Sequence, residues 1–274
     1  MKISHRRFEE LLWAIGFHGL YLSIRRLTRR GRHTESVLKS LKAFYRPLLP
    51  PGALVFDIGA NIGTYSLAFS SLGARVVALE PNPDCVRHML LSYGPARIET
   101  LQAAAGDRNG LATISLSEEV DPISSMSDDW IESIQRVHPD YAGQWSQKVP
   151  VPMVTLDSVI QHFGVPYFIK IDVEGFEENV LDGLSTQPRL LSFEFNTAFL
   201  EATFRCLDNK LFSDASRFNF AFGDPDAFVL PQWVGRDELK RTLSSKAQAA
   251  AEAELQGDIF VDSSEEIVCD LGLG

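Results

Sequence analysis

The sequence predicts an α/β fold in which helices cover a mostly parallel sheet. From residue 53 onward, short apolar runs alternate with helical stretches in a βαβαβ order. The apolar runs are continuous, which is typical of parallel strands buried on both faces. A loop of small residues joins the first strand to the first helix, at the place where open α/β sheets bind ligands.

The expected strands are short runs rich in β-branched and aromatic residues. They cover residues 54–58, 75–79, 98–103, 111–116, 151–156, 167–171, 190–195, 219–222 and 227–230. Helices are expected at 8–30, 34–46, 63–72, 82–94 and 240–255, and another is expected to begin near residue 174. Asn82 followed by Pro83 and Asp84 is a typical helix start, because Asn caps free amides and Pro fits the first turn.

A Leu-Leu-Pro-Pro-Gly segment at 48–52 separates an N-terminal helical extension, residues 1–50, from the main domain, residues 51–274. Residues 1–46 carry eleven Lys or Arg residues and three acids, although the whole chain has a net charge of −10. Two interpretations remain open for this basic segment. Its first helix either packs across the main domain or lies on an anionic membrane surface.

The composition excludes several classes of protein. The net charge of −10 argues against a nucleic-acid binder. The three cysteines, Cys85, Cys206 and Cys269, form no zinc spacing, which favours a reducing compartment. Because there is no apolar run long enough to span a bilayer and no signal-peptide cleavage site, we expect a cytoplasmic protein, with peripheral contact at the inner face of the membrane left open.

The loop after the first strand contains Gly59, Ala60, Asn61 and Gly63, and Glu80 ends the next strand about 20 residues further on. This arrangement predicts a nucleoside site in which the acid binds the ribose hydroxyls. The loop departs from the dinucleotide pattern G-x-G-x-x-G, and Asp57 opposes a pyrophosphate. An acid there suits a cationic ligand such as S-adenosylmethionine, so we expect that cofactor rather than NAD.

Three segments, 57–66, 80–83 and 168–177, together resemble the FkbM-type S-adenosylmethionine-dependent methyltransferases. The resemblance implies a class I methyltransferase fold, which is Rossmann-like with a seven-stranded sheet and a reversed last strand. It also implies an O-methyltransferase for sugar or polyketide hydroxyls. By the same resemblance, Asp57, Gly59, Asn61 and Gly63 line the methionine end of the cofactor, Glu80 and Asn82 lie at the ribose, and Gln102 to Ala104 contact the adenine.

The candidate catalytic residues follow the fourth and fifth central strands. Lys170, Asp172 and Glu174 lie at the mouth of the 167–171 strand, where Asp172 either orients the acceptor hydroxyl, accepts its proton or caps the next helix. Glu174 has the same ambiguity. Lys170 in an apolar strand requires an acidic partner, either Asp172 or Glu194. Glu194 ends the next strand and faces either the same cleft or solvent.

Three further expectations concern ligands. Asp172, Glu174 and Glu194 offer oxygen ligands for a divalent cation, but we expect no metal. The polar segment 117–148 contains Trp130, Tyr141 and Trp145, which suits a lid over a glycan or another small-molecule acceptor. The alternatives are a solvated insertion for this segment and, for the whole chain, a non-catalytic nucleoside-binding module or an NAD-dependent oxidoreductase.

Overall fold

The computed structural model describes residues 29–94, 97–116, 124–127, 132, 147–250 and 255–263, with side chains from residue 35 onward. Nearly all of the helix expected at 8–30 lies outside these residues. So do most of the expected lid, including its three aromatic residues, and the third cysteine, Cys269. Within the described part of the chain, no helix is long and apolar enough to cross a membrane.

The main sheet has seven strands, and six of them run parallel. In spatial order they are β10 (Arg217–Phe222), β11 (Gln256–Asp262), β9 (Leu190–Asn196), β8 (Phe168–Ile171), β1 (Leu54–Ile58), β2 (Arg75–Leu79) and β3 (Ile98–Leu101). Strand β11 is antiparallel to both of its neighbours, β10 and β9. The structure therefore confirms the seven-stranded, Rossmann-like sheet with a reversed last strand.

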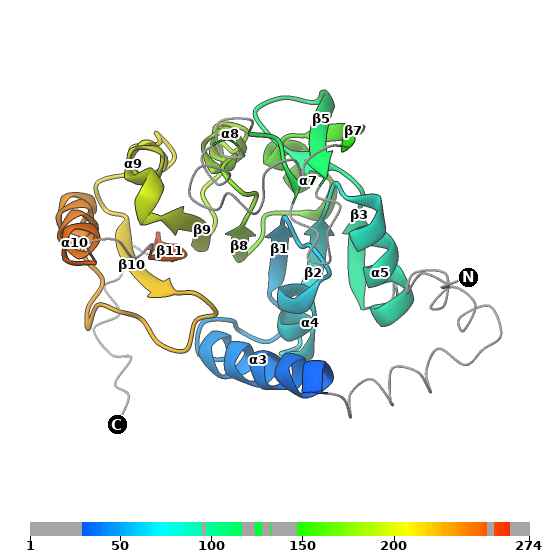
Figure 1. The fold of residues 1–274 in the computed structure, drawn as a ribbon, viewed down its shortest axis with the longest axis horizontal. Helices are drawn as coiled ribbons and strands as arrows, with labels where there is room; N and C mark the ends of the chain where they lie inside the picture. Colours follow the sequence, from blue (N-terminus) through cyan, green and yellow to red (C-terminus); the bar gives the residue numbers. More distant parts are fainter. Residues whose placement is uncertain are drawn as a thin grey trace.

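Helices cover both faces of this sheet (Figure 1). They are α3 (Arg29–Tyr45), α4 (Thr64–Ser71), α5 (Pro83–Tyr93), α7 (Leu156–Phe163), α8 (Glu177–Asp182), α9 (Leu200–Leu207) and α10 (Arg236–Ala249), with a short 3-10 turn, η2 (Thr197–Phe199), before α9. Figure 1 shows α3 and α4 on one side of the sheet and α8 and α9 on the other.

The two faces of the central strand β1 contribute to two different hydrophobic clusters. Val55 packs with Leu41 of α3 and Phe69 of α4. Phe56 and Ile58 pack in the cluster on the other face, which includes residues of α7, α8 and α9. This double burial explains the continuous apolar runs of the sequence.

A smaller sheet lies beyond the end of β3. Its strands are β4 (Ala104–Ala105), β7 (Gln147–Val154), β5 (Gly110–Leu116) and β6 (Ser124–Ser125), in that order. The strand expected at 98–103 is therefore shorter and ends at Leu101, since the amide of Ala103 donates to the carbonyl of Leu101 in a tight turn before β4. The turn moves the chain from the main sheet to the smaller one.

One expected strand is wrong and three strands were missed. Residues 227–230 form no strand, because the side chain of Asn219 binds both backbone groups of Leu230 and takes the place of a regular ladder. The missed strands are the two-residue β4 and β6 and the longer β11, whose apolar run is only Ile259 to Val261. The helix expected near residue 174 begins at Glu177, because Glu174 and Gly175 have φ angles of 54° and 89°.

Candidate active site

A pocket lies beyond the carboxyl ends of β1, β2 and β8, where the sequence predicts a ligand site. Seven of the predicted site residues line it: Gly59, Asn61, Glu80, Ala103, Ala104, Asp172 and Glu174. Its other lining residues are Leu79, Pro81, Ala105, Ile114, Ser125, Met126 and Val173. The pocket is therefore shared by the first loop of the main sheet, the β8 loop and the smaller sheet.

The loop after β1 requires glycine where it meets the loop after β8. Gly59 has a φ of 80°, and a Cβ atom there would lie 1.7 Å from the carbonyl oxygen of Asp172. The amides of Gly59 and Ala60 both donate to the carbonyl of Leu79, at 2.9 and 3.0 Å. This close packing fixes the loop against β2 and β8, with Asn61 exposed at its tip in a left-handed conformation (φ 51°).

Glu80 is held at the end of β2 by two backbone amides. Its Oε2 accepts from the amide of Asn61 at 2.7 Å, and its Oε1 accepts from the amide of Asn82 at 2.8 Å. A carboxylate has about four acceptor positions, so each oxygen can accept one more donor. The structure thus presents Glu80 in a fixed orientation toward the pocket, as two ribose hydroxyls would require.

Four of the predicted cofactor residues lie outside the pocket lining, behind the loop. Asp57 is buried and accepts a hydrogen bond from Ser66 of α4 at 2.5 Å. Gly63 begins α4, where a Cβ atom would meet the side chain of Met89. Ala60 is buried, and Asn82 is the buried N-cap of α5, accepting from the amide of Asp84.

Gln102, the remaining predicted cofactor residue, is exposed and does not line the pocket. The turn between β3 and β4 places the other two residues expected at the adenine, Ala103 and Ala104, in the pocket lining. Their small, uncharged side chains suit a purine ring.

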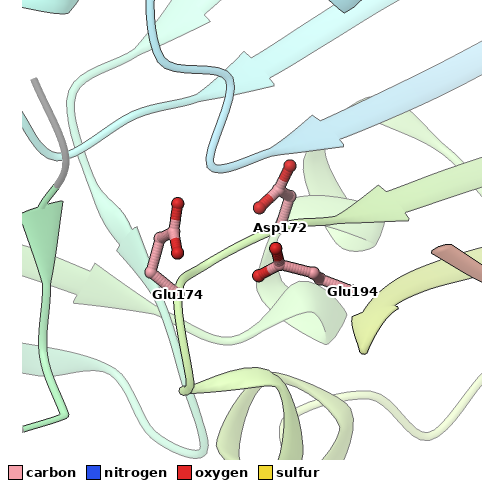
Figure 2. A group of neighbouring side chains, drawn as sticks. All are labelled: Asp172, Glu174 and Glu194. Carbon is pink, nitrogen blue, oxygen red and sulfur yellow. The ribbon is translucent and has the colours of Figure 1, made fainter. Parts of the chain in front are cut away.

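Three acids converge next to this pocket, at the ends of β8 and β9. Each of Asp172, Glu174 and Glu194 offers a carboxylate oxygen, and these oxygens all lie within 4.8 Å of one another. Figure 2 shows the three carboxyl groups close together, two from the loop after β8 and one from β9. Such a group could hold a divalent cation, although Asp172 is already paired with a lysine. The absence of a metal stays a prediction.

Lys170 is buried in β8, and its ammonium is 2.7 Å from Oδ2 of Asp172. This is one of the two partners that the sequence analysis left open, and the period-two spacing of the strand explains it. The other, Glu194, is no ion-pair partner within the described residues. Asp172 is not a helix cap either, because α8 begins only at Glu177.

Burial shifts the protonation of these groups. It raises the pKa of Glu80 from 4.5 to about 7, despite the two amides that lower it. It also raises the pKa values of Glu174 and Glu194, and the neighbouring carboxylates raise them further. Burial alone would lower the pKa of Lys170, but Asp172 and Asp258 bring it well above the usual value.

Two acids of this region were not expected from the sequence. Glu177 is buried at the start of α8, and its Oε1 accepts from the amides of Val173 and Gly175 at 3.2 Å, which shapes the loop carrying Glu174. Asp258 of β11 lies 3.8 Å from the ammonium of Lys170. Glu177 is the last residue of the segment 168–177, so the sequence could have indicated it as a site residue. Asp258 could not be indicated in this way, because it lies on the missed strand β11.

The residues present fit S-adenosylmethionine. The pocket offers carboxylates at Glu80, Asp172 and Glu174 and no Lys, Arg or His among its described lining residues, which suits a ligand bearing ammonium and sulfonium charges. A pyrophosphate would meet these acids without a compensating cation. Small residues at Ala103 and Ala104 leave room for a purine, and the oriented Glu80 suits ribose hydroxyls.

Similar solved structures have low sequence identity to the chain. The precorrin-6y C5,15-methyltransferase of Geobacter metallireducens is 13% identical, with a TM-score of 0.41, over 87% of this chain and 92% of that one. The plantazolicin methyltransferase BpumL is 9% identical, with a TM-score of 0.40, over 92% and 93%. A TehB-like methyltransferase of Corynebacterium glutamicum is 11% identical, with a TM-score of 0.37, over 80% and 86%. No curated protein matches the chain.

The family model gives the decisive comparison. The model of the methyltransferase FkbM domain matches residues 57–227, which is more than half of the chain. The match begins at Asp57 and includes the Glu80 loop and all four residues at the ends of β8 and β9. The chain belongs to the FkbM family of S-adenosylmethionine-dependent methyltransferases.

Proposed function

We propose that the protein is an O-methyltransferase whose acceptor is a hydroxyl of a carbohydrate, a glycolipid or a polyketide-like small molecule. The observation that carries this proposal is the convergence of Asp172, Glu174 and Glu194 beside the cofactor pocket. Carboxylates accept hydrogen bonds from hydroxyl groups, and an acceptor with several hydroxyls can use more than one of them.

S-adenosylmethionine, held by the loop of Gly59 and by Glu80, would supply an electrophilic methyl group for the acceptor oxygen and would leave as S-adenosylhomocysteine, while the hydroxyl loses its proton to the protein. Asp172 binds and orients the acceptor hydroxyl. Its Oδ2 is occupied by Lys170, and among the described residues nothing donates to its Oδ1, which is left for the acceptor. Orientation of this kind supplies a large part of the rate of a displacement reaction.

Glu174 is the better residue to accept the proton. Its pKa is raised by burial and by Asp172, which moves it toward the neutral range where a general base is most effective. Glu177 holds the loop that presents it, through the amides of Val173 and Gly175. Glu194 completes the polar wall on the side of β9.

The segment 117–148 supplies the cover on the acceptor side in this proposal. Of its described residues, Ser125 and Met126 line the pocket. The hydroxyl of Ser125 donates to the carbonyl of Glu174 at 2.7 Å and also accepts from the amide of Ser127. This contact supports a cover that is anchored to the loop bearing the proposed base.

The test is methyl transfer from S-adenosylmethionine labelled with ¹³C in its methyl group to a panel of glycans, glycolipids and polyketides. We expect a product whose ¹³C spectrum shows an O-methyl group. Asp172→Asn should lower kcat by roughly 100-fold, whereas Asp208→Asn, which breaks an exposed ion pair with Lys240, should leave it unchanged. Label on nitrogen, sulfur or carbon would contradict O-methylation, and full activity of Asp172→Asn would contradict the role of that residue.

A further inference from the structure

The ammonium of Lys170 is enclosed by groups from three elements that are far apart in the sequence. It lies 2.7 Å from Oδ2 of Asp172, 3.8 Å from Oδ1 of Asp258 and 4.4 Å from the ring centre of Tyr65. Lys170 is 2% exposed. A buried ammonium is costly unless it is paired, and here two carboxylates and an aromatic face compensate it.

The sheet register explains how β11 reaches Lys170 across β9. Lys170 pairs with Ser192 of β9, and Ser192 pairs with Phe260 of β11, two residues from Asp258. Ser192 is fully buried and small, so it leaves space between the two charged side chains. Asp258 also pairs directly with Glu194, which places both carboxylates on the same face of the sheet as Lys170.

We propose that Asp258 is a positioning residue of the methyl-transfer site, which acts through Lys170 on Asp172. This inference rests on the proposed function, because that function places Asp172 beside the reacting oxygen. Asp258 does not line the cofactor pocket and does not touch Asp172 among the contacts of the described residues. Lys170 is the described residue that forms ion pairs with both Asp258 and Asp172.

The charge balance of this group indicates what Asp258 contributes. Asp172 and Asp258 carry two negative charges and Lys170 carries one positive charge, so the group keeps a net negative charge next to a cationic ligand. Without the charge of Asp258, Lys170 would neutralise Asp172 completely and would no longer be held from the β11 side. Asp172 would then lose both its fixed orientation and its excess charge.

A binding measurement that needs no acceptor can test this role. Sinefungin carries an ammonium group where S-adenosylmethionine carries its methyl group, whereas S-adenosylhomocysteine carries nothing there. The ratio of their dissociation constants, from calorimetry, therefore reports on the negative charge presented to the methyl position. We expect the wild type to bind sinefungin more tightly than S-adenosylhomocysteine. In Asp258→Asn, the ratio of the two dissociation constants should shift about tenfold against sinefungin. The affinity of this variant for S-adenosylhomocysteine should change less than about twofold.

A matched control lies at the other end of the same strand. Asp262 forms an ion pair with Arg189 at 3.1 Å, so Asp262→Asn also removes an ion pair from β11. We expect this variant to keep the wild-type preference. Asp258→Glu, which retains the charge, should restore most of the preference lost in Asp258→Asn.

A double-mutant cycle with Lys170→Met separates action through the lysine from a direct effect of charge on the ligand. In the Lys170→Met background, we expect Asp258→Asn to leave the preference unchanged. An equal loss in both backgrounds would overturn the inference, as would an unchanged preference in Asp258→Asn itself. Should Lys170→Met not fold, Asp258→Asn and Asp262→Asn still test whether the charge of Asp258 controls the preference. An unchanged preference in Asp258→Asn, or an equal loss in Asp262→Asn, would overturn the inference.

Asp172→Asn distinguishes failure of this inference from failure of the proposed function. Loss of the preference in Asp172→Asn but not in Asp258→Asn would overturn the role of Asp258 alone. An unchanged preference in Asp172→Asn would show that this carboxylate is not presented to the methyl position. That result would overturn both the proposed role of Asp172 and the role of Asp258 behind it.

Discussion

The substitution Gly59→Ala, which adds one methyl group, would separate the loop after β1 from the loop after β8 at the cofactor pocket. The Cβ atom would lie 1.7 Å from the carbonyl oxygen of Asp172, which belongs to backbone and cannot rotate away. The loop would have to move from β8, and both Asn61 and Asp172 would move with it. Gly59 is thus needed for contact between backbones as well as for its positive φ.

Gly52 is a matched control for this effect, because its φ of 75° is close to the 80° of Gly59 and a Cβ there would meet nothing within 4 Å. We expect Gly52→Ala to cost about 1 kcal/mol of unfolding free energy, the cost of a left-handed conformation. Gly59→Ala should cost at least about 3 kcal/mol and abolish S-adenosylmethionine binding. Urea unfolding and calorimetry measure the two effects, and equal costs for the two variants would contradict the importance of the contact.

The elements show which parts of the fold can be predicted from sequence. Strands β1 and β2 were predicted with their observed bounds, because each is a short, mostly apolar run followed by a turn signal, Gly59 or Pro81. Strand β11 was missed because its two ends, Gln256 to Asp258 and Asp262, are polar and its burial comes from strands on both sides. Its place in the sheet is set by long-range pairing, which a local pattern does not contain.

Some residues of the site could likewise be predicted from the sequence, and others could not. Gly59, Glu80 and Asp172 directly follow predicted strands, so sequence order alone placed them at one edge of the sheet. Gln102 lies outside the pocket lining because the turn at Ala103 interrupts the strand. Asp258 and Tyr65 could not be predicted, since their approach to Lys170 depends on the position of β11 and on the packing of α4.

Helix α3 illustrates an element whose basic composition conceals a structural role. Leu41 and Tyr45 are fully buried in the cluster that covers one face of the sheet, whereas Lys39 is exposed. We expect Leu41→Ala to lower the unfolding free energy by about 2–5 kcal/mol, because it leaves a cavity beneath the sheet. Lys39→Ala should change it by less than about 0.5 kcal/mol. Chemical denaturation compares the two, and a stable Leu41→Ala variant would show that α3 is dispensable for the main domain.

Across the whole molecule, acids with raised pKa values gather at one edge of the main sheet. Burial raises the pKa of Glu80 to about 7 and that of Asp258 to about 6, and it also raises the pKa values of Asp57, Glu174 and Glu177. A fold would not gather so many acids in one place for stability alone. The edge is built for a cationic ligand, and binding such a ligand favours the ionised forms.

This edge should make the ligand-free protein less stable as the pH rises. In the unfolded chain Glu80 ionises near 4.5, but in the folded protein it ionises near 7, so between these values the unfolded state binds fewer protons and the unfolding free energy falls with pH. Lys170 does not change the unfolding free energy with pH in this interval, because its pKa lies well above it in both states. For Glu80 alone the loss of unfolding free energy is about 3 kcal/mol by pH 8.

We expect urea unfolding to show a lower unfolding free energy at pH 8 than at pH 5. This decrease should be smaller in Glu80→Gln, whereas the exposed control Glu99→Gln should show the wild-type decrease. Saturating S-adenosylmethionine should reduce the decrease in the wild type, because the ligand stabilises the ionised carboxylates. Stability that is constant or increases from pH 5 to pH 8 would show that these acids are not desolvated as the structure places them.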